Sequence, residues 1–565
     1  MPKKIVIVGG VAGGATAAAR LRRLDEDCTI ILLERGPDIS FANCGLPYHI
    51  GGEITRRKKL ILQTPNSLGR RFALDIRTRH EAIAIDRAAK TIRARDLESG
   101  REYDEPYDSL ILSPGAEPIR PPLPGVDHAR VRTLRNLGDM DQIKQLVDDG
   151  AQTALVVGGG FIGLELAESL RHRGLDVTLV ELLPQVMPPL DSEMAAPLHI
   201  ELERAGVKLL LGDAVTEFDG QGEQHVAVTL RSGTTLTVDL VALAVGVRPE
   251  SNLARDAGLE LNQRGAIIVD DRMRTSDPSI YAVGDAVEVA DAVLGGPVMI
   301  PLAGPANRQA RIAADNICGR SSRYRGTQGT SILRVFNQTA ALTGLSEKTL
   351  KQRGTAYHKV YIQTKHHVGY FPGGRQLLIK LLFAKETGRV LGAQIVGPEG
   401  VDKRIDVLAL AVQTGMTVGQ LEQVELAYAP PFGAAKDPIN IAGFVATNLL
   451  RGDIECVYAE ELDAAARADW TIVDLRQASE LTSGGIPGAI SIPLPELRER
   501  WGEIPRDKPI ALCCTTGQRS YYAYRTLKQK GVACKNLMGG LTVFYYTHAG
   551  GPEVASWPAP PKCGA

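Results

Sequence analysis

The chain has 565 residues, which is enough for roughly three to five domains. Hydrophobic residues make up 44% and charged residues 23%, as in an ordinary soluble globular protein. Lys and Arg together number 65, and so do Asp and Glu, so net charge gives no reason to expect a nucleic acid or an anionic membrane as partner.

The first residues run directly into the short apolar stretch Ile5–Val8, which is too short for a signal-peptide core and predicts a first strand. The longest apolar run, Leu240–Val247, cannot span a bilayer. The 8 cysteines follow no framework spacing and include no C-x2-C zinc pair, which suits a reducing compartment. The sequence therefore predicts a cytoplasmic, non-membrane protein without a metal site.

Apolar runs alternate with helical stretches through the first 320 residues, which predicts parallel α/β layers. These runs are Ile5–Val8, Ile30–Leu33, Leu110–Leu112, Leu155–Val157, Val177–Val180, Leu240–Val245 and Ile280–Val283. From about Thr327 to Ala446 the strands become longer and more polar, as in Gln376–Phe383 and Val390–Val396, which predicts an α+β domain.

A linker is expected at Leu450–Ile454. Beyond it a small α/β pattern begins, with predicted strands at Thr471–Asp474 and Ile510–Cys513. The proline-rich tail from Trp557 is expected to be loose.

A glycine-rich turn follows the first predicted strand and precedes a helix. Its glycines are Gly9, Gly10, Gly13 and Gly14. Such a turn lets the backbone approach a pyrophosphate, which the helix N-terminus attracts. Glu34 ends the next strand twenty residues after Gly14, where a carboxylate would bind a ribose hydroxyl, and Arg35 beside it is assigned to the same cofactor site. Val11 interrupts the strict G-x-G-x-x-G pattern, so a glycine-rich turn of an unrelated α/β protein is the alternative.

A second motif matches G-x-G-x-x-G through Gly158, Gly160 and Gly163. Glu181 closes the following strand eighteen residues after Gly163. A carboxylate there accepts a hydrogen bond from a free 2′-hydroxyl and repels a 2′-phosphate, so NADH is favoured over NADPH. Glu165 either faces the nicotinamide side or is only a carboxylate at the start of the helix.

Three later segments favour FAD at the first site. Leu112–Ala116, with Gly115, and Gly246–Pro249 resemble the turns of an FAD domain where the chain crosses over. Thr275–Asp285 resembles the segment of two-dinucleotide flavoproteins whose aspartate, here Asp285, binds the flavin ribityl chain.

The stretch Ser40–Tyr48 places Cys44 ten residues after Glu34. A thiol at this distance from a redox cofactor can exchange electrons with it. The next cysteine is Cys318, so Cys44 has no local partner, and a thiol from outside the chain is expected to form its disulfide.

Residues 1 to about 447 resemble the pyridine nucleotide–disulfide oxidoreductase family, in the single-cysteine branch of coenzyme A disulfide reductases. The resemblance implies that Cys44, with Asn43 beside it, forms a mixed disulfide with CoA, which flavin reduced by NAD(P)H then cleaves. Ser40, in the same stretch, is assigned to substrate binding.

The resemblance also implies that Tyr370 and Tyr428 reach the active site across a homodimer interface, although Phe371 stands where a second tyrosine is usual. A phenol near a leaving thiolate can hydrogen-bond or protonate it. The alternative is that both tyrosines are core aromatics.

Basic residues near the first motif are candidates for binding the phosphates of CoA. They are Arg20, Arg23 and Arg71. Since a cluster of charges is usually a solvated face, that alternative stays open.

The C-terminal segments Ile472–Arg476 and Gly484–Leu494 resemble a rhodanese domain, with Gly485 where a histidine is common. An exposed-looking loop follows, with Cys514 and Arg519 in the expected places. Backbone N–H groups around one sulfur, with Arg519 nearby, would lower the pKa of the Cys514 thiol and stabilise a persulfide anion. Cys513, which precedes it, is expected to be buried. A vicinal disulfide between Cys513 and Cys514 is the less favoured alternative.

The sequence thus predicts an α/β protein with two Rossmann-like dinucleotide-binding domains, an α+β dimerisation domain and a C-terminal rhodanese α/β domain. The expected ranges are 1–150 and 255–326 for FAD binding, 151–254 for NADH binding, 327–447 for dimerisation and 456–565 for the rhodanese domain.

The resemblance implies a homodimeric NADH-dependent flavoenzyme that acts on small sulfur substrates, namely CoA disulfide, CoA persulfide or polysulfide. One alternative is an NADH oxidase or peroxidase that cycles through a sulfenic acid at Cys44. The other is a redox sensor that reports flavin and thiol state to a partner.

Overall fold

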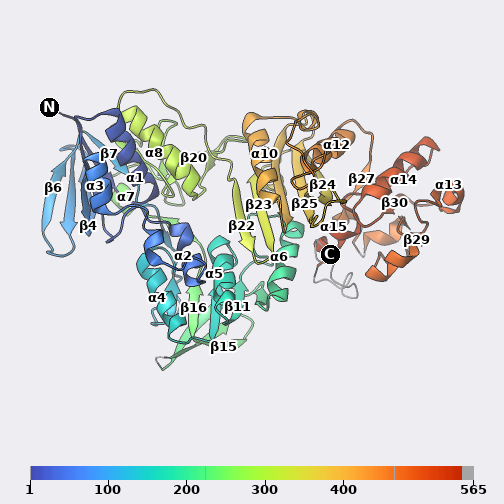
Figure 1. Cartoon of the computed structure of the whole chain (residues 1–565), viewed down its shortest axis with the longest axis horizontal. Helices are drawn as coiled ribbons and strands as arrows, with labels where there is room; N and C mark the ends of the chain where they lie inside the picture. Colours follow the sequence, from blue (N-terminus) through green and yellow to red (C-terminus); the bar gives the residue numbers. More distant parts are fainter. Residues whose placement is uncertain (1, 223, 464, 550–565) are drawn as a thin grey trace. The chain divides into compact units, whose positions relative to one another are not determined.

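The computed structural model describes residues 2–222, 224–463 and 465–549 (Figure 1). The predicted loose tail from Trp557, together with Cys563, lies outside these residues. The chain divides into two compact units: unit 1 comprises residues 1–182 and 206–329, and unit 2 comprises residues 183–205 and 330–565.

Unit 1 contains two five-stranded parallel sheets. The first has the order β19-β7-β1-β2-β3. Its strands are Ile280–Ala282 (β19), Ser109–Leu112 (β7), Lys4–Val8 (β1), Thr29–Glu34 (β2) and Asp75–Thr78 (β3). The central strands are short runs of fully buried apolar residues because helices cover both faces of such sheets.

The second sheet repeats this plan in the order β12-β11-β10-β16-β9. Its strands are Lys208–Leu211 (β12), Asp176–Glu181 (β11), Thr153–Val157 (β10), Leu240–Leu243 (β16) and Val131–Thr133 (β9). The glycine motif follows β1 in the first sheet and β10 in the second. On either side of each of these strands the chain continues in opposite directions across the sheet, and α/β sheets bind dinucleotides at such a switch point.

The helices of unit 1 join and cover these sheets (Figure 1). They are α1 (Ala12–Leu24), α2 (Leu46–Ile50), α3 (Pro65–Phe72), α4 (Leu137–Asp148), α5 (Phe161–His172), α7 (Asn252–Asp256) and α8 (Ala303–Ile317). Helix α1 packs along α8, and α2 packs on both α4 and α5.

Small sheets extend the parallel layers of unit 1; all their strand pairs are antiparallel except β18 with β20, which is parallel. They are β4-β5-β6 (His80–Asp86, Thr91–Asp96, Glu102–Pro106), β13-β14-β15 (Val215–Gln221, His225–Leu230, Thr235–Val238), β17-β8 (Val247–Pro249, Ala116–Pro118) and β18-β20-β21 (Ile267–Ile268, Val287–Ala290, Pro297–Val298).

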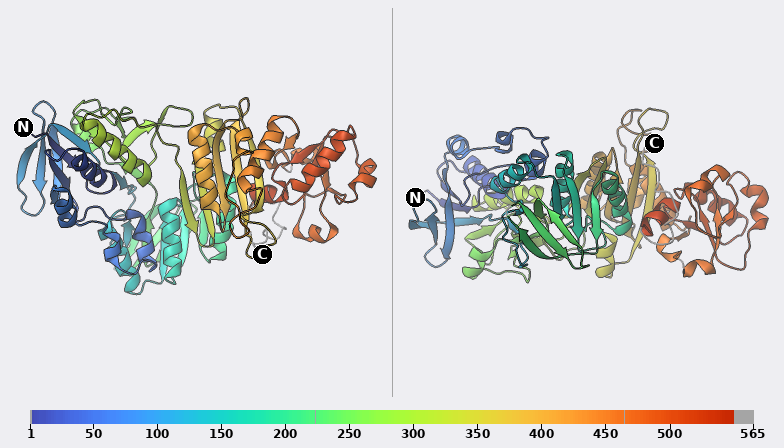
Figure 2. Two further views of the ribbon diagram at one scale, coloured as in Figure 1. Left: turned by 45° about the horizontal axis from the view of Figure 1, so that its top comes forward. Right: turned by 90° about the horizontal axis from the view of Figure 1, so that it is seen from below.

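Unit 2 is built on an antiparallel sheet of order β22-β23-β26-β25-β24. The strands are Ser331–Val335 (β22), Gln338–Gly344 (β23), Val390–Gly397 (β26), Gln376–Ala384 (β25) and Tyr357–Lys365 (β24). The helices that pack with it are α6 (Ser192–Arg204), α9 (Glu347–Gln352), α10 (Val401–Thr414), α11 (Val418–Leu421) and α12 (Pro438–Leu450). Figure 2 shows α10 and α12 lying along this sheet.

The C-terminal part of unit 2 is a second, parallel sheet of order β27-β31-β30-β28-β29. Its strands are Cys456–Val457 (β27), Lys535–Leu537 (β31), Ile510–Cys513 (β30), Thr471–Asp474 (β28) and Ile490–Ser491 (β29). Its α-helices are α13 (Leu497–Arg500), α14 (Gln518–Gln529) and α15 (Gly540–Thr547), and the short 3-10 helices η3 (Ala459–Glu461) and η5 (Ala478–Ser483) lie in its connections.

The predicted α/β architecture is confirmed, and strands form at all the apolar runs named above. One segment differs from the sequence assignment, which placed residues 151–254 in one domain. Residues 183–205 belong instead to unit 2, because Asp191 and Glu193 at the start of α6 form buried ion pairs with Lys380 of β25. Sequence cannot foresee a pairing between residues so far apart.

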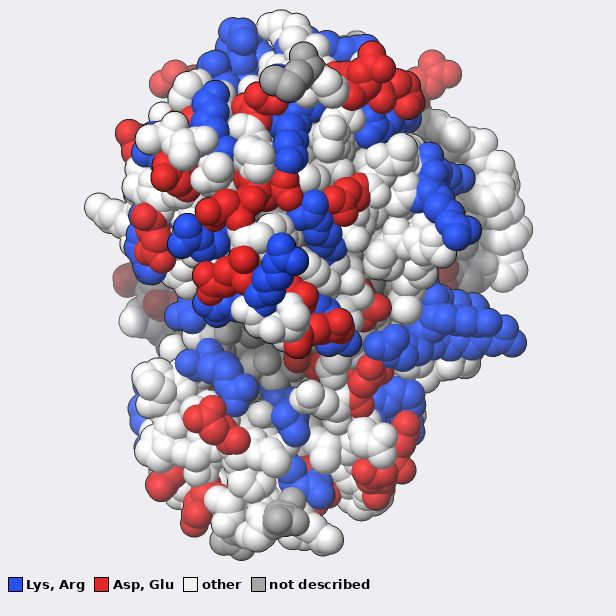
Figure 3. All heavy atoms as spheres, turned by 90° about the vertical axis from the view of Figure 1, so that its left-hand side faces the viewer, with Lys and Arg blue, Asp and Glu red and all other residues white. Residues whose placement is uncertain are grey.

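Basic and acidic side chains are interleaved over most of the face seen in Figure 3, in line with the balanced composition. No helix in the described part of the chain is both long enough and apolar enough to cross a membrane.

Candidate active site

Cys44 lies in a single 3-10 turn, η1 (Asn43–Gly45), immediately before α2. Its side chain is exposed, and its backbone N–H donates to Oδ1 of Asn43 at 3.1 Å. Although solvent reaches the thiol, desolvation raises its pKa, and the carboxylates of Glu165 and Asp285 raise it further. The structure therefore brings Cys44, Glu165 and Asp285 into one electrostatic neighbourhood.

The structure places Glu165 near Cys44, which the sequence alone could not do. It projects from α5, and the hydroxyl of Tyr48 donates to its Oε1 at 3.0 Å. Tyr48 belongs to the cysteine stretch, so the hydrogen bond links that stretch to the helix of the second glycine motif. In the sequence, Glu165 stands out only by lying two residues after Gly163. That position fits either a residue facing the nicotinamide or an ordinary carboxylate at the start of a helix.

The first glycine turn fits a dinucleotide. Gly9 adopts φ +93°, and a Cβ there would lie 2.1 Å from the carbonyl oxygen of Ser113, so only glycine is accommodated. No side chain among the described residues caps the N-terminus of α1, and its first turn carries no acidic residue. The helix N-terminus therefore keeps free N–H donors for a pyrophosphate.

Glu34 ends β2 beside this turn. Its two carboxylate oxygens accept from the N–H groups of Gly10 at 2.8 Å and Gly36 at 2.7 Å. These bonds fix the carboxylate at the strand end, where a ribose hydroxyl is expected. Arg35 is committed elsewhere, since it forms ion pairs with Glu117 and Glu250.

The second glycine turn repeats this geometry. Gly158 has φ +106°, and a Cβ there would lie 2.4 Å from the carbonyl oxygen of Ala244. A Cβ at Gly160, in contrast, would meet no atom of the described structure within 4 Å, so this side of the turn is open to a ligand. Glu181 is buried at the end of β11, and its Oε2 accepts from the N–H of Gly159 at 2.6 Å.

The remaining predicted FAD residues line the same end of unit 1. A Cβ on Gly115 would meet nothing within 4 Å of the described structure, which leaves room for a ligand. Asp285 follows β19, and partial burial raises the pKa of its carboxyl group, against the opposing effect of Arg135. A carboxylate that the protein leaves poorly solvated fits a site completed by a hydroxyl donor.

Two of the three arginines predicted to bind CoA have partners within the protein. Arg20 forms a largely buried ion pair with Asp315 of α8, at 2.8 Å. Arg23 is exposed and lies over the ring of Phe72, 5.7 Å from its centroid, and Arg71 is exposed at the end of α3. Ser40 has φ +45°, and its carbonyl oxygen accepts from the N–H of Leu62 at 3.0 Å.

Tyr370 and Tyr428 meet in unit 2, with their hydroxyl oxygens 2.9 Å apart. They are 74% and 46% exposed, so the core-aromatic alternative is wrong. The hydrogen bond with Tyr428 raises the pKa of Tyr370. Phe371 and Phe432 are also exposed nearby in the sequence, at 37% and 70%.

The loop after β30 is less open than its sequence predicted. Cys514 is fully buried, which corrects the expectation of an exposed loop. Gly540 of α15 lies so close that a Cβ there would be 2.4 Å from the Cys514 carbonyl oxygen. Cys513 is also buried, as expected, and both thiols are free.

The sulfur of Cys514 is held by its own loop. The N–H of Gly517 donates to Sγ at 3.2 Å, and Oγ of Ser520 lies 3.5 Å from it. Arg519 does not supply an uncompensated charge, because its guanidinium pairs in a fork with Glu480, at 2.6 Å for each bond. No sequence motif pointed to Glu480.

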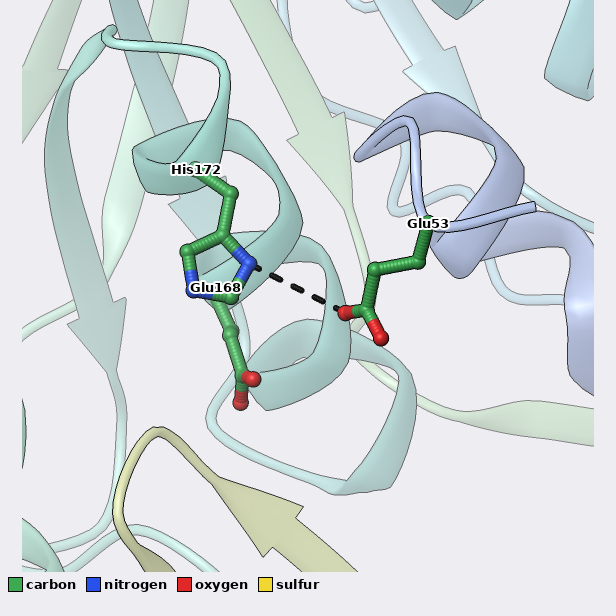
Figure 4. A group of neighbouring side chains, drawn as sticks. All are labelled: Glu53, Glu168 and His172. Atoms are coloured by element: carbon green, nitrogen blue, oxygen red, sulfur yellow. Dashed lines mark ion pairs between the residues drawn. The ribbon is translucent and has the colours of Figure 1, made fainter. Parts of the chain in front are cut away.

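A third cluster joins the turn after α2 to α5: Glu53, Glu168 and His172 (Figure 4). His172 Nδ1 lies 3.8 Å from Glu53 Oε1. Their potential ligand atoms lie within 4.8 Å of one another, but two of the three side chains are exposed. An ion pair across the α2–α5 contact accounts for this arrangement.

These features together fit a flavoprotein-type fold that exposes a thiol at Cys44, and comparisons with known proteins agree with this fold. Residues 3–310 match the model of the pyridine nucleotide-disulphide oxidoreductase family, and residues 331–437 match its dimerisation domain. Residues 458–546 match the rhodanese-like domain. The chain belongs to the pyridine nucleotide-disulphide oxidoreductase family, whose members use FAD and a nicotinamide nucleotide.

Individual proteins of known name or structure are similar to this chain over most of their length. The chain is 37% identical over 446 residues to a coenzyme A disulfide reductase of Staphylococcus epidermidis, covering 78% of this chain and 99% of that protein. The reduced CoADR-RHD crystal structure from Bacillus anthracis is 48% identical with a TM-score of 0.95, covering 97% of this chain and 98% of that one. An NAD-dependent persulfide reductase from A. fulgidus is 37% identical with a TM-score of 0.90, covering 96% and 99%.

Proposed function

We propose that the protein uses NADH to reduce CoA disulfide or CoA persulfide through Cys44, and that its rhodanese domain carries sulfane sulfur on Cys514. The observation that supports this most is the exposed thiol of Cys44, near the two dinucleotide turns, in a chain that resembles the B. anthracis CoADR-RHD protein along nearly its full length.

The residues proposed to hold the cofactors are those of the two glycine turns and the strand ends beyond them. For FAD these are Gly9, Gly13, Gly14, Glu34, Gly115 and Asp285, and for NADH they are Gly158, Gly160, Gly163 and Glu181. A bound FAD would supply the two electrons that NADH delivers to the disulfide at Cys44.

Cys44 performs the thiol chemistry. Its thiolate attacks one sulfur of CoA disulfide, so that a Cys44–CoA disulfide forms and one CoA thiolate leaves. Two electrons and a proton then return the Cys44 thiolate and release the second CoA thiol. For CoA persulfide, the same two-electron reduction yields CoA thiol and hydrogen sulfide.

The two tyrosines are proposed to act from the dimerisation domain of the partner subunit in a homodimer. The pair is exposed and linked by a hydrogen bond, so the phenol of one can donate while the other holds it in place. A phenol placed near the departing CoA sulfur would protonate it. The oxidase alternative assigns no task to the rhodanese domain or to this pair.

Mass spectrometry of the purified holoenzyme, before and after reduction, tests the proposal. A mass increase of one CoA on the peptide that contains Cys44, removed by NADH, is the expected result, together with NADH oxidation dependent on CoA disulfide. Steady NADH turnover with oxygen or peroxide alone, and no CoA adduct, would favour the oxidase or peroxidase reaction instead.

A further inference from the structure

Arg519 of the Cys514 loop forms an ion pair with Glu480, a residue outside the loop. Both terminal nitrogens of Arg519 donate to the two carboxylate oxygens of Glu480, each at 2.6 Å. Nη2 of Arg519 also donates to Oγ1 of Thr515, at 3.1 Å. Such forked pairs fix both partners in one plane and leave little charge to act on a ligand.

The N–H of Gln477 donates to Oε2 of Glu480 at 3.0 Å and so fixes the carboxylate. Arg476, only 2% exposed, donates from Nη1 to the carbonyl oxygen of Glu480 at 3.2 Å and forms a buried pair with Asp474 at 2.7 Å. Gly485 lies beside the end of this arginine, since a Cβ there would be 2.9 Å from Nη2 of Arg476. The carboxylate is therefore part of a built arrangement and not a side chain that happens to meet Arg519.

Arg519 interacts with the Cys514 thiol as well as with Glu480, but the sulfur also has two neutral partners. The N–H of Gly517 and the hydroxyl of Ser520 both contact Sγ of Cys514. These neutral donors can stabilise a thiolate or a persulfide anion without attracting a charged donor from solution. The second ion pair near the loop, Asp474 with Arg476, is also internally neutral.

We propose that Glu480 determines which sulfur donors the Cys514 loop accepts: by neutralising Arg519, it favours the persulfides of small thiols over dianionic thiosulfate. The inference rests on the proposed sulfane-carrier function and adds to it the class of donor. Thiosulfate brings two negative charges to the transferred sulfur, whereas the persulfide of a thiol such as glutathione carries its other charges at a distance.

The two donors lead to the same product on Cys514. With thiosulfate, the Cys514 thiolate attacks the outer sulfur, an S–S bond forms, and sulfite leaves with the electron pair of the broken bond. With a persulfide RSSH, the thiolate attacks the terminal sulfur, and the thiolate RS⁻ leaves. No oxidant or reductant is consumed in either transfer, so the donors differ mainly in the charge that must approach Arg519.

The test is sulfur transfer to cyanide by the holoenzyme, with thiosulfate and glutathione persulfide as donors. Glu480→Gln removes the charge and keeps the size, and we expect the thiosulfate kcat/KM to rise about tenfold. The persulfide value should change by less than about threefold. Because Arg519 then carries an uncompensated charge, the gain should shrink as salt is added.

Two variants serve as controls. Glu480→Asp keeps the charge and should retain the wild-type donor preference. Glu503→Gln disrupts an exposed pair with Arg500 outside the Cys514 loop and should leave both donors unchanged. If Glu480→Gln lowers both rates together, or leaves their ratio and its salt dependence as in the wild type, Glu480 is only structural. If the wild-type enzyme transfers sulfur from neither donor, the sulfane-carrier function itself fails.

Discussion

At the scale of single residues, the environment of Cys44 is the most informative feature. Its thiol is reached by solvent but lies near two carboxylates, and desolvation together with Glu165 and Asp285 raises its pKa. Because its pKa is raised, the Cys44 thiol of the free enzyme is mostly protonated at neutral pH. The fraction present as reactive thiolate therefore increases as pH rises.

Replacing Glu165 with glutamine tests this effect. The variant keeps an acceptor for Tyr48 but removes a negative charge, so the pKa of Cys44 should fall. Alkylation of Cys44 by iodoacetamide, followed by peptide mass spectrometry across pH, should be roughly threefold faster near neutral pH. Glu53→Gln is the control, because Glu53 is not among the charges that act on Cys44. An unchanged alkylation profile would remove Glu165 from the site.

Glu181 offers a second test at this scale. Its carboxylate lies at the end of β11 and is fixed by the N–H of Gly159. Glu181→Gln keeps this hydrogen bond and removes the repulsion of a 2′-phosphate, so the NADPH-to-NADH ratio of kcat/KM should rise roughly three- to tenfold. The exposed Asp176 begins the same strand, and Asp176→Asn should leave the ratio unchanged. A wild-type enzyme that prefers NADPH would contradict the assignment.

At the scale of secondary-structure elements, strand alternation in unit 2 creates a buried polar face. Tyr361 of β24, Lys380 of β25 and Gln394 of β26 are register partners and point to the same side of the sheet. Lys380 is fully buried, and burial opposes its charge, but Glu193 and its other neighbours outweigh that effect and raise its pKa well above the ordinary value.

Removing Lys380 should be costly, because three buried carboxylates would lose an ion-pair partner, although Glu347 would keep Lys359. They are Asp191, Glu193 and Glu347. We expect Lys380→Met to lower the free energy of unfolding by about 3–5 kcal/mol. Protonation would neutralise the uncompensated carboxylates, so the loss should shrink as pH falls.

Thermal and denaturant unfolding at neutral and mildly acidic pH measure this loss. Arg500→Gln, which breaks exposed ion pairs on α13, is the comparison and should have a much smaller effect. Equal stabilities of wild type and Lys380→Met would show that the cluster contributes nothing to folding.

The same polar face supports the rhodanese domain. Gln363 of β24 donates from Nε2 to the carbonyl oxygen of Gly539 at 2.6 Å, immediately before α15. Lys359 pairs with Glu460 of η3, and the hydroxyl of Tyr458 donates to the Lys359 carbonyl at 2.9 Å. Since α15 also donates from Leu541 to the Cys514 carbonyl, the two parts of unit 2 meet beside the cysteine loop.

At the scale of the whole molecule, the two thiols should respond differently to mutation. Cys44→Ser should stop NADH-dependent reduction of every sulfur substrate. Cys514→Ser should stop sulfur transfer but leave reduction of CoA disulfide largely intact, because a carrier can be bypassed while the redox thiol cannot. NADH oxidation by both variants with several donors is the measurement. If Cys514→Ser matches wild type with all donors, the domains are only tethered.

The proposed homodimer makes a further prediction. Tyr428→Phe removes one hydroxyl of the exposed pair with Tyr370. Turnover with CoA disulfide should fall roughly tenfold or more, while the dimer mass and bound FAD stay as in the wild type. Unchanged kinetics would leave Tyr428 with a packing role at the surface.

The sequence by itself determined the architecture and the location of the chemistry. Short apolar runs gave the strands, and the two glycine turns and the Cys44 stretch indicated the sites, because each depends on local spacing along the chain. Tertiary structure alone decided that Glu165 lies near Cys44, that Glu480 neutralises Arg519, and that residues 183–205 join unit 2. These features are contacts between charges far apart in the sequence. A charged residue in a sequence looks the same whether solvent or a buried partner balances it, and only the folded chain decides which.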